Sequence, residues 1–328
     1  MPDVAQTAAA TPPMAWAVFG LIVFVILGAD LFYFNRRPHV AGLFESTVWA
    51  AVCVAAALGF NVGVYFWKGP EAALKFATVY VLEESLSVDN LFIFLLIFTY
   101  FKVPVSSRHR VLFWGILGAI AMRGVLITAG VALVQYFNWL LFLFGAILIY
   151  SGAKLVFSKE EAYEPSQTLV FRLTKKYLPV TEQYDGAHFL ALENGRRLGT
   201  PLLMVLIMIE TADLVFAVDS IPACLGQSQD PFIVLTSNIF AVMGLRALYF
   251  VIAGLMGSIR YLRPALALVL LFIGVKMLWE ESRKHDFLPA GWGERLEITT
   301  GMSLAVVAAI LGIAVVASFL RPKPAEDK

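Results

Sequence analysis

Two stretches of this sequence place acidic residues inside segments that are otherwise apolar. The stretches read YVLEESLSVDNLF and IETADLVFAVDSIP, and each carries three carboxylates. Moving an ionisable group to the centre of a bilayer costs at least ~2.5–3.5 kcal/mol on insertion scales. Six such groups in two similar segments therefore indicate a function. These acids are Glu83, Glu84, Asp89, Glu210, Asp213 and Asp219.

A hard cation is the ligand that these acids suit best. Carboxylates, joined by the Asn90 amide oxygen and the Ser220 hydroxyl, are typical of sites for manganese, calcium or magnesium. Zinc and copper are disfavoured, because all four histidines lie outside the acidic stretches and the cysteines have no partner ligand there. We interpret Cys53 and Cys224 as small core residues.

Basic residues inside apolar segments change the charge balance. Six ionised acids against four bases leave two negative charges, which one divalent cation or two protons would balance. Metal and protons would then compete for the same carboxylates. The alternative is a structural network of ion pairs with no ligand. Asp30 and Glu45 lie near the ends of apolar runs and are expected at the membrane interface. The four bases are Arg123, Lys154, Arg246 and Lys276.

Helical spacing restricts which acids share a site. Glu210 and Asp213 are three residues apart, so they share one face of a helix. Asp89 and Asp219 each follow an earlier acid by six residues, which turns them about 120° away from it. The helices therefore either contact two polar regions or are locally unwound, and Pro222 favours an interruption in the second.

Composition places the chain in a bilayer. Of its 328 residues, 59% are hydrophobic and 15% are charged, whereas a soluble domain carries about 25% charged residues. The sequence predicts an all-α, polytopic membrane protein with a single membrane domain (residues 1–328), and no basic cluster points to nucleic acid. The apolar runs are long enough to cross ~30 Å of hydrocarbon as helices. About nine transmembrane helices are expected, near residues 14–34, 44–66, 74–100, 111–135, 138–157, 200–222, 232–255, 263–280 and 300–320.

The positive charges predict the orientation. Most Lys and Arg outside the expected helices lie in segments that are cytoplasmic if the N-terminus is outside and the C-terminus inside. The first helix should be retained, because Met1–Pro13 lacks the basic start of a signal peptide. The loop 158–198 is then cytoplasmic. Apolar alternation around 168–180 and a hairpin-like Asn194-Gly195 turn indicate partial order, as a small cap or a tether that could bind a protein partner.

Charged motifs recur in the same order in two halves of the chain. AMRG around Arg123 resembles GLRA around Arg246, and SGAK at Lys154 resembles IGVK at Lys276. VDN and VDS match in the acidic stretches, although Glu84 has no counterpart. Because the second half begins three helices later, it would run in the opposite direction through the membrane. This predicts an inverted-topology repeat, an architecture common in secondary transporters.

The repeats are expected at about 74–157 and 200–280, with 14–34, 44–66 and 300–320 as peripheral helices. Glu83 should match Asp213, and Asp89 should match Asp219, about a pseudo-two-fold axis in the membrane plane. Each Arg should have a carboxylate or carbonyl within hydrogen-bonding reach.

The motifs also carry a family resemblance. ESLSVDNLF, TPLLMVLIMIETADLVFAVDSIPA, DPFIVLTSNIFAVMGLRALYF and LFIGVKMLW resemble the TerC family of integral membrane proteins, particularly its Alx-like branch in the lysine-exporter superfamily. The resemblance covers roughly residues 45–280, and CLGQSQ after Ala223 is more polar than the family pattern. It implies manganese export across the bacterial cytoplasmic (inner) membrane and an association with tellurium resistance. The implied acidic positions are Glu83, Asp89, Glu210, Asp213 and Asp219, with Asn90, Ser220 and Asn238 as neutral oxygen ligands.

The leading hypothesis is a secondary transporter, not an enzyme, that exports Mn²⁺ in exchange for protons. It would hold no permanent cofactor, and Arg123, Arg246, Lys154 and Lys276 would support the electrostatics of the site. One alternative is a membrane scaffold or sensor, linked to tellurium resistance, whose acids and bases form a fixed network. Another is transport of Ca²⁺ or a tellurium oxyanion.

Overall fold

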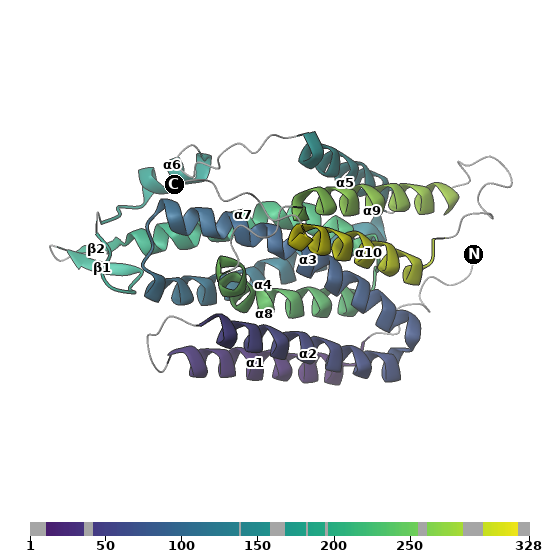
Figure 1. The fold of residues 1–328 in the computed structure, drawn as a ribbon, viewed down its shortest axis with the longest axis horizontal. Helices are drawn as coiled ribbons and strands as arrows, with labels where there is room; N and C mark the ends of the chain where they lie inside the picture. The colour runs from purple at the N-terminus through teal and green to yellow at the C-terminus, as the bar shows by residue number, and fades with distance from the viewer. Residues whose placement is uncertain are drawn as a thin grey trace.

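The computed structural model describes residues 11–35, 42–137, 139–157, 168–181, 183–193, 196–254, 261–284 and 298–320. Long helices account for most of them (Figure 1). Seven of these helices are long and apolar enough to cross a membrane. The chain is therefore an all-α polytopic membrane protein. The seven are α1 (Pro13–Asn35), α2 (Leu43–Lys68), α4 (Val105–Tyr136), α5 (Leu140–Phe157), α7 (Pro201–Leu225), α8 (Pro231–Gly254) and α10 (Thr300–Leu320).

Two further helices, α3 (Pro70–Tyr100) and α9 (Leu262–Lys284), carry charged residues along apolar segments. Their lengths, 31 and 23 residues, resemble those of the other seven. Each of the nine long helices lies at one of the positions expected from the sequence.

Local sequence explains where these helices begin. Gly69, between α2 and α3, has φ +91°, which favours glycine, and Pro70 then opens α3 in the position where a missing N–H costs nothing. Pro201 opens α7 in the same way. Before α8, the Asp230 carboxylate accepts a hydrogen bond from the Phe232 backbone N–H at 2.9 Å and so caps the helix.

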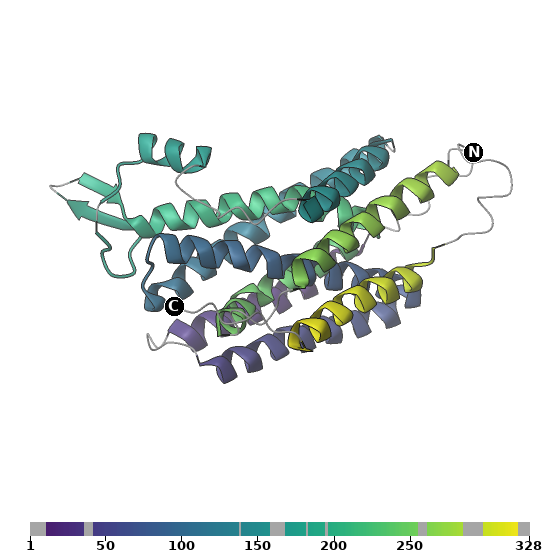
Figure 2. The same ribbon diagram turned by 45° about the horizontal axis from the view of Figure 1, so that its top comes forward.

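The expected cytoplasmic loop contains one short helix and one hairpin. Helix α6 (Leu169–Tyr177) begins at Thr168, whose side chain accepts a hydrogen bond from the Phe171 amide at 3.3 Å. The apolar alternation that the sequence shows around 168–180 thus belongs largely to an amphipathic helix. Strands β1 (Leu190–Glu193) and β2 (Arg196–Gly199) pair antiparallel on either side of Asn194-Gly195, a turn that lies outside the described residues. Hairpin and α6 lie at one end of the bundle, at the left of Figures 1 and 2.

The helices α3 and α7 pack against each other and run in opposite directions. Phe98, in the second half of α3, shares one core cluster with Leu202 in the first half of α7. Leu82, in the first half of α3, shares another with Ile221 near the end of α7. The acids of the two helices are therefore brought together near the crossing point.

Helices α5 and α9 approach so closely that their backbones touch. A Cβ at Gly152 would lie 2.9 Å from the Ala267 carbonyl oxygen, and a Cβ at Gly274 would lie 2.9 Å from the Gly145 carbonyl oxygen. Only small residues such as glycine and alanine permit two helices to cross at this distance. The crossing is reciprocal, because each helix contributes two contacting residues from one face. Gly145 and Gly152 are seven residues apart on α5, and Ala267 and Gly274 are seven residues apart on α9.

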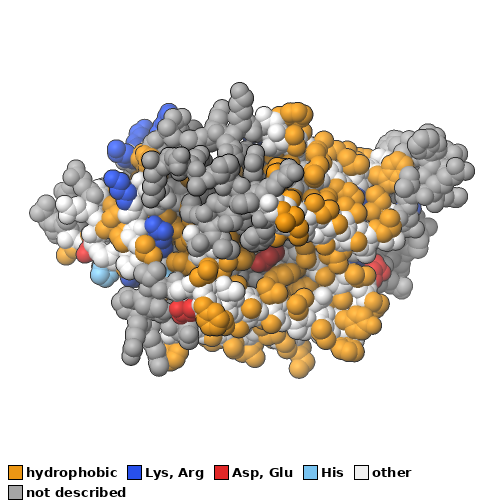
Figure 3. Space-filling model, in the orientation of Figure 1, with side chains coloured by type: hydrophobic (Ala, Val, Ile, Leu, Met, Phe, Trp, Pro, Cys, Tyr) orange, Lys and Arg blue, Asp and Glu red, His pale blue; other side chains and the backbone are white. Residues whose placement is uncertain are grey.

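The outer surface is apolar where lipid would contact it. The long helices expose large side chains such as Phe24, Val125 and Val316, and hydrophobic atoms cover much of the face in Figure 3. Basic side chains gather near α6 in the same view, where Lys175 and Lys176 are exposed. This distribution is the one expected of a bilayer-embedded bundle with a charged end.

Candidate ion-binding site

Arg123 of α4 is the centre of a buried cluster of charges. The residue is fully buried, and its side chain binds the Asp213 carboxylate with two hydrogen bonds, at 3.0 and 2.9 Å. It also contacts Glu83 Oε2 at 2.5 Å and the Asn238 amide oxygen at 3.3 Å. One guanidinium therefore joins acids from α3 and α7, with the strong geometry of a bidentate pair.

The acids outnumber the bases in this cluster. Glu83 and Asp213 are both buried, and the second oxygen of Glu83 accepts a hydrogen bond from the Cys224 thiol at 3.1 Å. A neutral thiol and one guanidinium leave the cluster one negative charge in excess if both acids are ionised. Buried charge of this kind is costly unless it is balanced by a cation or a proton.

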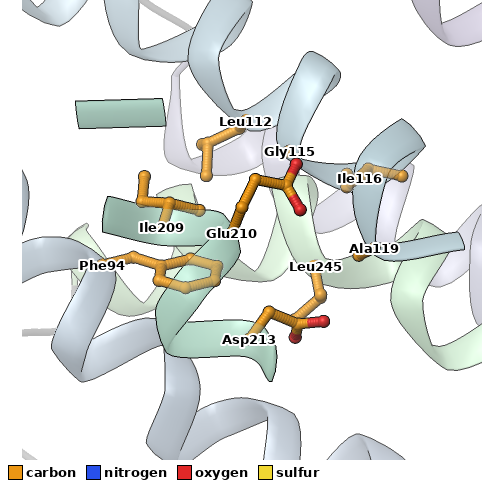
Figure 4. A pocket seen from close by; sticks show the side chains of 9 residues that line it. All are labelled: Phe94, Leu112, Gly115, Ile116, Ala119, Ile209, Glu210, Asp213 and Leu245. Atoms are coloured by element: carbon orange, nitrogen blue, oxygen red, sulfur yellow. The ribbon is translucent and has the colours of Figure 1, made fainter. Parts of the chain in front are cut away.

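Glu210 lies one turn before Asp213 and lines a small pocket with it (Figure 4). The two share a helix face as expected, but Figure 4 shows their carboxylates pointing apart. Asp213 turns to Arg123, and Glu210 lies against Gly118 of α4, where a Cβ would overlap the carboxylate. The other residues lining the pocket are Phe94, Leu112, Gly115, Ile116, Ala119, Ile209 and Leu245.

A second polar region lies between α3, α5, α7 and α9. It is a pocket of about 470 Å³ lined by Asn90, Lys154, Asp219 and Ser220 among others. The Ser151 hydroxyl donates to Asp219 Oδ1 at 2.8 Å. The Ser220 side chain is buried, and its hydroxyl has no hydrogen-bond partner among the residues that the structure describes. This pocket brings several oxygen atoms together around Asp219.

The acids thus face two polar regions, as one of the two sequence interpretations held. Both α3 and α7 are continuous helices, and α7 continues through Pro222, so the alternative interpretation, local unwinding, does not hold for them. The six-residue spacing turns Asp219 away from the cluster that holds Asp213. The Asp89 side chain lies outside those that the structure describes.

Arg246 does not join the acids of α3 and α7 in the contacts described. It forms an ion pair with Asp30 of α1, and both residues are buried, at 4% and 5% exposed. Asp30 was selected only as an interfacial residue, and the structure shows that its carboxylate is buried where α1 packs against α8. Each buried Arg does contact a carboxylate, as predicted.

The two lysines have different surroundings. Lys154 is exposed and lines the pocket that holds Asp219. Lys276 is buried, donates a hydrogen bond to the Gln227 side chain at 2.9 Å and lies 3.6 Å from Glu280. It thus lies at the turn between α7 and α8. The polar stretch CLGQSQ supplies the Gln227 partner that a buried lysine needs.

The acids whose side chains the structure describes are not gathered into a formed metal cage. Among the described residues, no group of three or more His, Cys, Asp or Glu side chains is arranged to hold a metal ion. The Arg123 guanidinium occupies the space between Glu83 and Asp213. A cation that used these two carboxylates would have to displace it.

Asp30, Cys224 and Ser151 contact the candidate site or its bases, although sequence reasoning did not select them as site residues. Asp30 stood in an apolar run, and that signal was available but was assigned to the interface. Cys224 and Ser151 gave no signal, because a small residue in a membrane helix is usually a packing residue. Their contacts with Glu83 and Asp219 come from helices far apart in the sequence.

Comparisons with known proteins agree with this architecture. The model of the "Integral membrane protein TerC family" matches residues 68–325 and so includes α10, beyond the stretch in which the sequence resemblance was recognised. No solved structure matches the chain.

Relatives align over most of the chain. A membrane protein of Myxococcus xanthus is 43% identical over 95% of this chain and 94% of its own length. The "Putative membrane-bound redox modulator Alx" of Salmonella typhi is 41% identical over 81% and 85%. The "Thylakoid membrane protein TERC, chloroplastic" of Arabidopsis thaliana is 44% identical over 78% and 67%. The chain therefore belongs to the TerC family of integral membrane proteins.

Proposed function

We propose that this protein is a secondary transporter that exports a divalent metal ion, Mn²⁺, from the cytoplasm in exchange for protons. The observation that carries the proposal is the pair of buried carboxylates, Glu83 and Asp213, that share the single guanidinium of Arg123. The excess negative charge favours uptake of a cation or protons. Because the two carboxylates lie on different helices, the affinity for a cation can depend on the relative position of those helices.

Nine membrane spans and an inverted repeat are part of this proposal. In the repeat, α3, α4 and α5 correspond to α7, α8 and α9. Helix α3 packs on α8 as α4 packs on α7, and the reciprocal crossing of α5 and α9 would lie on the pseudo-two-fold axis. Secondary transporters with inverted repeats bind their cargo where the repeats meet.

We place the transported ion between the buried cluster around Arg123 and the pocket that holds Asp219. Asp219, Asn90 and Ser220 supply oxygen atoms of three kinds, which suits Mn²⁺ with its preference for carboxylate, carbonyl and water ligands. Glu83, Asp213, Glu210 and Asp89 complete the acidic set. Exchange follows if protons replace the metal on these carboxylates, because ligands must be deprotonated to bind. Calcium fits the same ligands and is a second cargo to test.

The proposed location is the bacterial cytoplasmic membrane, with the N-terminus outside and the C-terminus inside. The basic residues of α6, including Lys175 and Lys176, would then face the cytoplasm, in agreement with the positive-inside rule. The same placement leaves α6 and the β1–β2 hairpin available to a protein partner.

Metal flux in proteoliposomes tests the proposal. Purified protein is reconstituted with an Mn²⁺-sensitive dye inside the vesicles, and flux is measured with and without a pH gradient. Wild type should show gradient-dependent Mn²⁺ movement, which Asp219→Asn and Asp213→Asn should abolish. Glu71→Gln is the matched control, because Glu71 lies on the same helix as Glu83 but is exposed at its end. Absence of flux in folded wild-type protein would defeat the proposal.

A membrane scaffold or sensor is the second candidate. It is favoured by the complete ion pairing of Arg123 and Arg246, which needs no ligand. The name "redox modulator", given to the Alx relatives, suits a role of this class. Under this reading, loss of Arg123 would unfold the protein, whereas Asp219→Asn would leave its cellular effect unchanged.

A further inference from the structure

A cavity of about 560 Å³ lies between α1, α4 and α8. Its size falls within the ~300–1,000 Å³ that is typical of ligand sites. Leu31 lines it from α1, Arg246 lines it from α8, and five residues of α4 supply the rest of its described walls. No acid is among these lining residues, and none of them lines the pockets of Glu210 and Asp219. The proposed transport site therefore leaves this basic and apolar cavity without a role.

The five residues of α4 form one face of that helix, and their character changes along it. His109 and Arg110 lie in the second turn of the helix, and Phe113 and Trp114 follow one turn later. Leu117 lies seven residues beyond Arg110, which is about 10 Å at 1.5 Å per residue. This face is therefore basic near the start of α4 and apolar further along.

The basic end of this face adjoins the hairpin end of the bundle. The guanidinium carbon of Arg110 lies 5.6 Å from the centroid of the Phe189 ring, which directly precedes β1. One turn earlier on α4, the Ser107 hydroxyl donates a hydrogen bond to the Gly186 carbonyl at 3.5 Å. In the orientation proposed above this end is cytoplasmic, so that Arg110 would lie near the lipid headgroups and Trp114 beside the upper part of the acyl chains.

Arg110 gives the cavity its net positive charge. The charge of Arg246 is balanced by Asp30, with which it forms an ion pair. Arg110 is exposed, and among the residues that the structure describes no carboxylate forms an ion pair with it. A guanidinium can bind a phosphate group through two parallel hydrogen bonds. An anionic headgroup beside Arg110 is therefore both neutralised and oriented.

We propose that this cavity binds an anionic phospholipid, with its phosphate on Arg110 and one acyl chain along Leu31, Trp114 and Leu117. Leu31 and Trp114 are 40% and 48% exposed, and an acyl chain covers both. Basic pockets between transmembrane helices on the cytoplasmic side bind anionic headgroups in the same way. The bound lipid contacts α1 and α4 at once and so joins the first helix to the bundle.

Quenching of Trp114 by brominated lipid tests the proposal. The full chain is placed in nanodiscs of phosphatidylcholine that contain a small fraction of one brominated lipid, either phosphatidylglycerol or phosphatidylcholine. The chain has seven tryptophans, so the Trp114 signal is the difference between wild type and Trp114→Phe. Brominated phosphatidylglycerol should quench this signal at a roughly tenfold lower mole fraction than brominated phosphatidylcholine, as expected for one charge-assisted contact.

Substitution of Arg110 identifies the residue that selects the lipid. Arg110→Gln should remove the preference for phosphatidylglycerol, because it removes the charge and leaves the apolar walls in place. Arg172→Gln is the matched control, since Arg172 is exposed on α6 at the same end of the bundle and is not among the described residues that line the cavity. This control should keep the preference.

Two results would overturn the proposal. Equal quenching by the two lipids in wild type would mean that the cavity does not select an anionic lipid, and it is the result expected if another part of the chain fills the cavity. An equal loss of preference in Arg110→Gln and Arg172→Gln would assign the preference to the general positive charge of this end of the bundle.

Inorganic phosphate separates the lipid from a soluble anion. Phosphate, compared with chloride at equal ionic strength, should leave the lipid preference unchanged, because it has no acyl chain to place against the apolar wall. If phosphate removes the preference, the cavity holds a soluble anion and the proposal fails.

Thermal unfolding in detergent gives an independent measurement. Added phosphatidylglycerol should raise the unfolding midpoint of wild type above the value in phosphatidylcholine, since a ligand stabilises the state that binds it. This difference should disappear in Arg110→Gln and persist in Arg172→Gln. The same midpoint in both lipids for wild type would count against a bound lipid. None of these measurements depends on metal binding, so they decide the lipid site whether or not the proposed transport function holds.

Discussion

Glu83 of α3 and Asp213 of α7 are bound by the same guanidinium, that of Arg123, at the crossing of two antiparallel helices. This relationship makes the arginine a bridge between the halves of the chain. A cation between these helices has to compete with a side chain that is already in place. The experiments below test separately the role of Arg123, the role of the acids and the packing of the helices.

Replacing Arg123 with lysine tests the bridge. Lysine keeps the charge but cannot form the two parallel hydrogen bonds to Asp213. We expect Arg123→Lys to lose on the order of 1–3 kcal/mol of stability, less than Arg123→Gln, which leaves two unpaired acids at about 3–5 kcal/mol. Thermal denaturation in detergent measures both. Equal losses in the two variants would mean that charge contributes nothing at this position.

Proton competition predicts how Mn²⁺ binding depends on pH. Carboxylates must be deprotonated to ligate metal, so affinity should be full at mildly alkaline pH and fall as the pH falls. Metal addition in weakly buffered solution should release protons. Titration calorimetry in buffers of different ionisation enthalpy gives both quantities. A constant affinity from mildly acidic to mildly alkaline pH would exclude metal–proton exchange.

Gly118→Ala tests the place of Glu210. A Cβ at Gly118 would overlap the Glu210 carboxylate, so the acid must rotate away, at a cost of about 1–3 kcal/mol. We expect reduced Mn²⁺ flux together with this loss of stability. Gly124→Ala on the same helix is the matched control, because no atom lies within 4 Å of its Cβ. Similar flux in the two variants would show that Glu210 has no part in transport.

Gly274→Ala tests the crossing of α5 and α9. The added methyl group would meet the Gly145 carbonyl oxygen at 2.9 Å, which forces the backbones apart and should destabilise by about 1–3 kcal/mol. Gly312→Ala on α10 has open space and should be neutral or slightly stabilising, since alanine favours helix. Comparing unfolding midpoints checks the prediction. No difference between the two would mean that the crossing is loosely packed.

The sequence predicted the helices well because apolar runs of membrane length have few other solutions. Their positions required only composition and length. The acids were identified because a carboxylate such as Glu83 or Asp213 in an apolar run is costly without a partner. Helical spacing left two possibilities, a division of these acids between two polar regions or a local unwinding of the helices, and it could not decide between them.

Other features depended on tertiary contacts that a sequence pattern cannot contain. Asp30 and Arg246 are separated by 216 positions, and nothing local to either residue indicates the other. Helix α6 was obscured because apolar residues near 168–180 also fit alternation. The close approach of Glu210 to Gly118 depends on the register of α7 against α4, which no single helix determines.

Pro222 has a consequence for the pocket that α7 lines. A proline nitrogen has no hydrogen to donate, so the Val218 carbonyl lacks the donor that a helix normally provides four residues later. Val218 lines the same pocket as Asp219 and Ser220. In a bilayer such a carbonyl must find another partner, and water or a hard cation meets that need. A cation held in this pocket would thereby gain a neutral backbone oxygen beside Asp219, with no further charge to be desolvated.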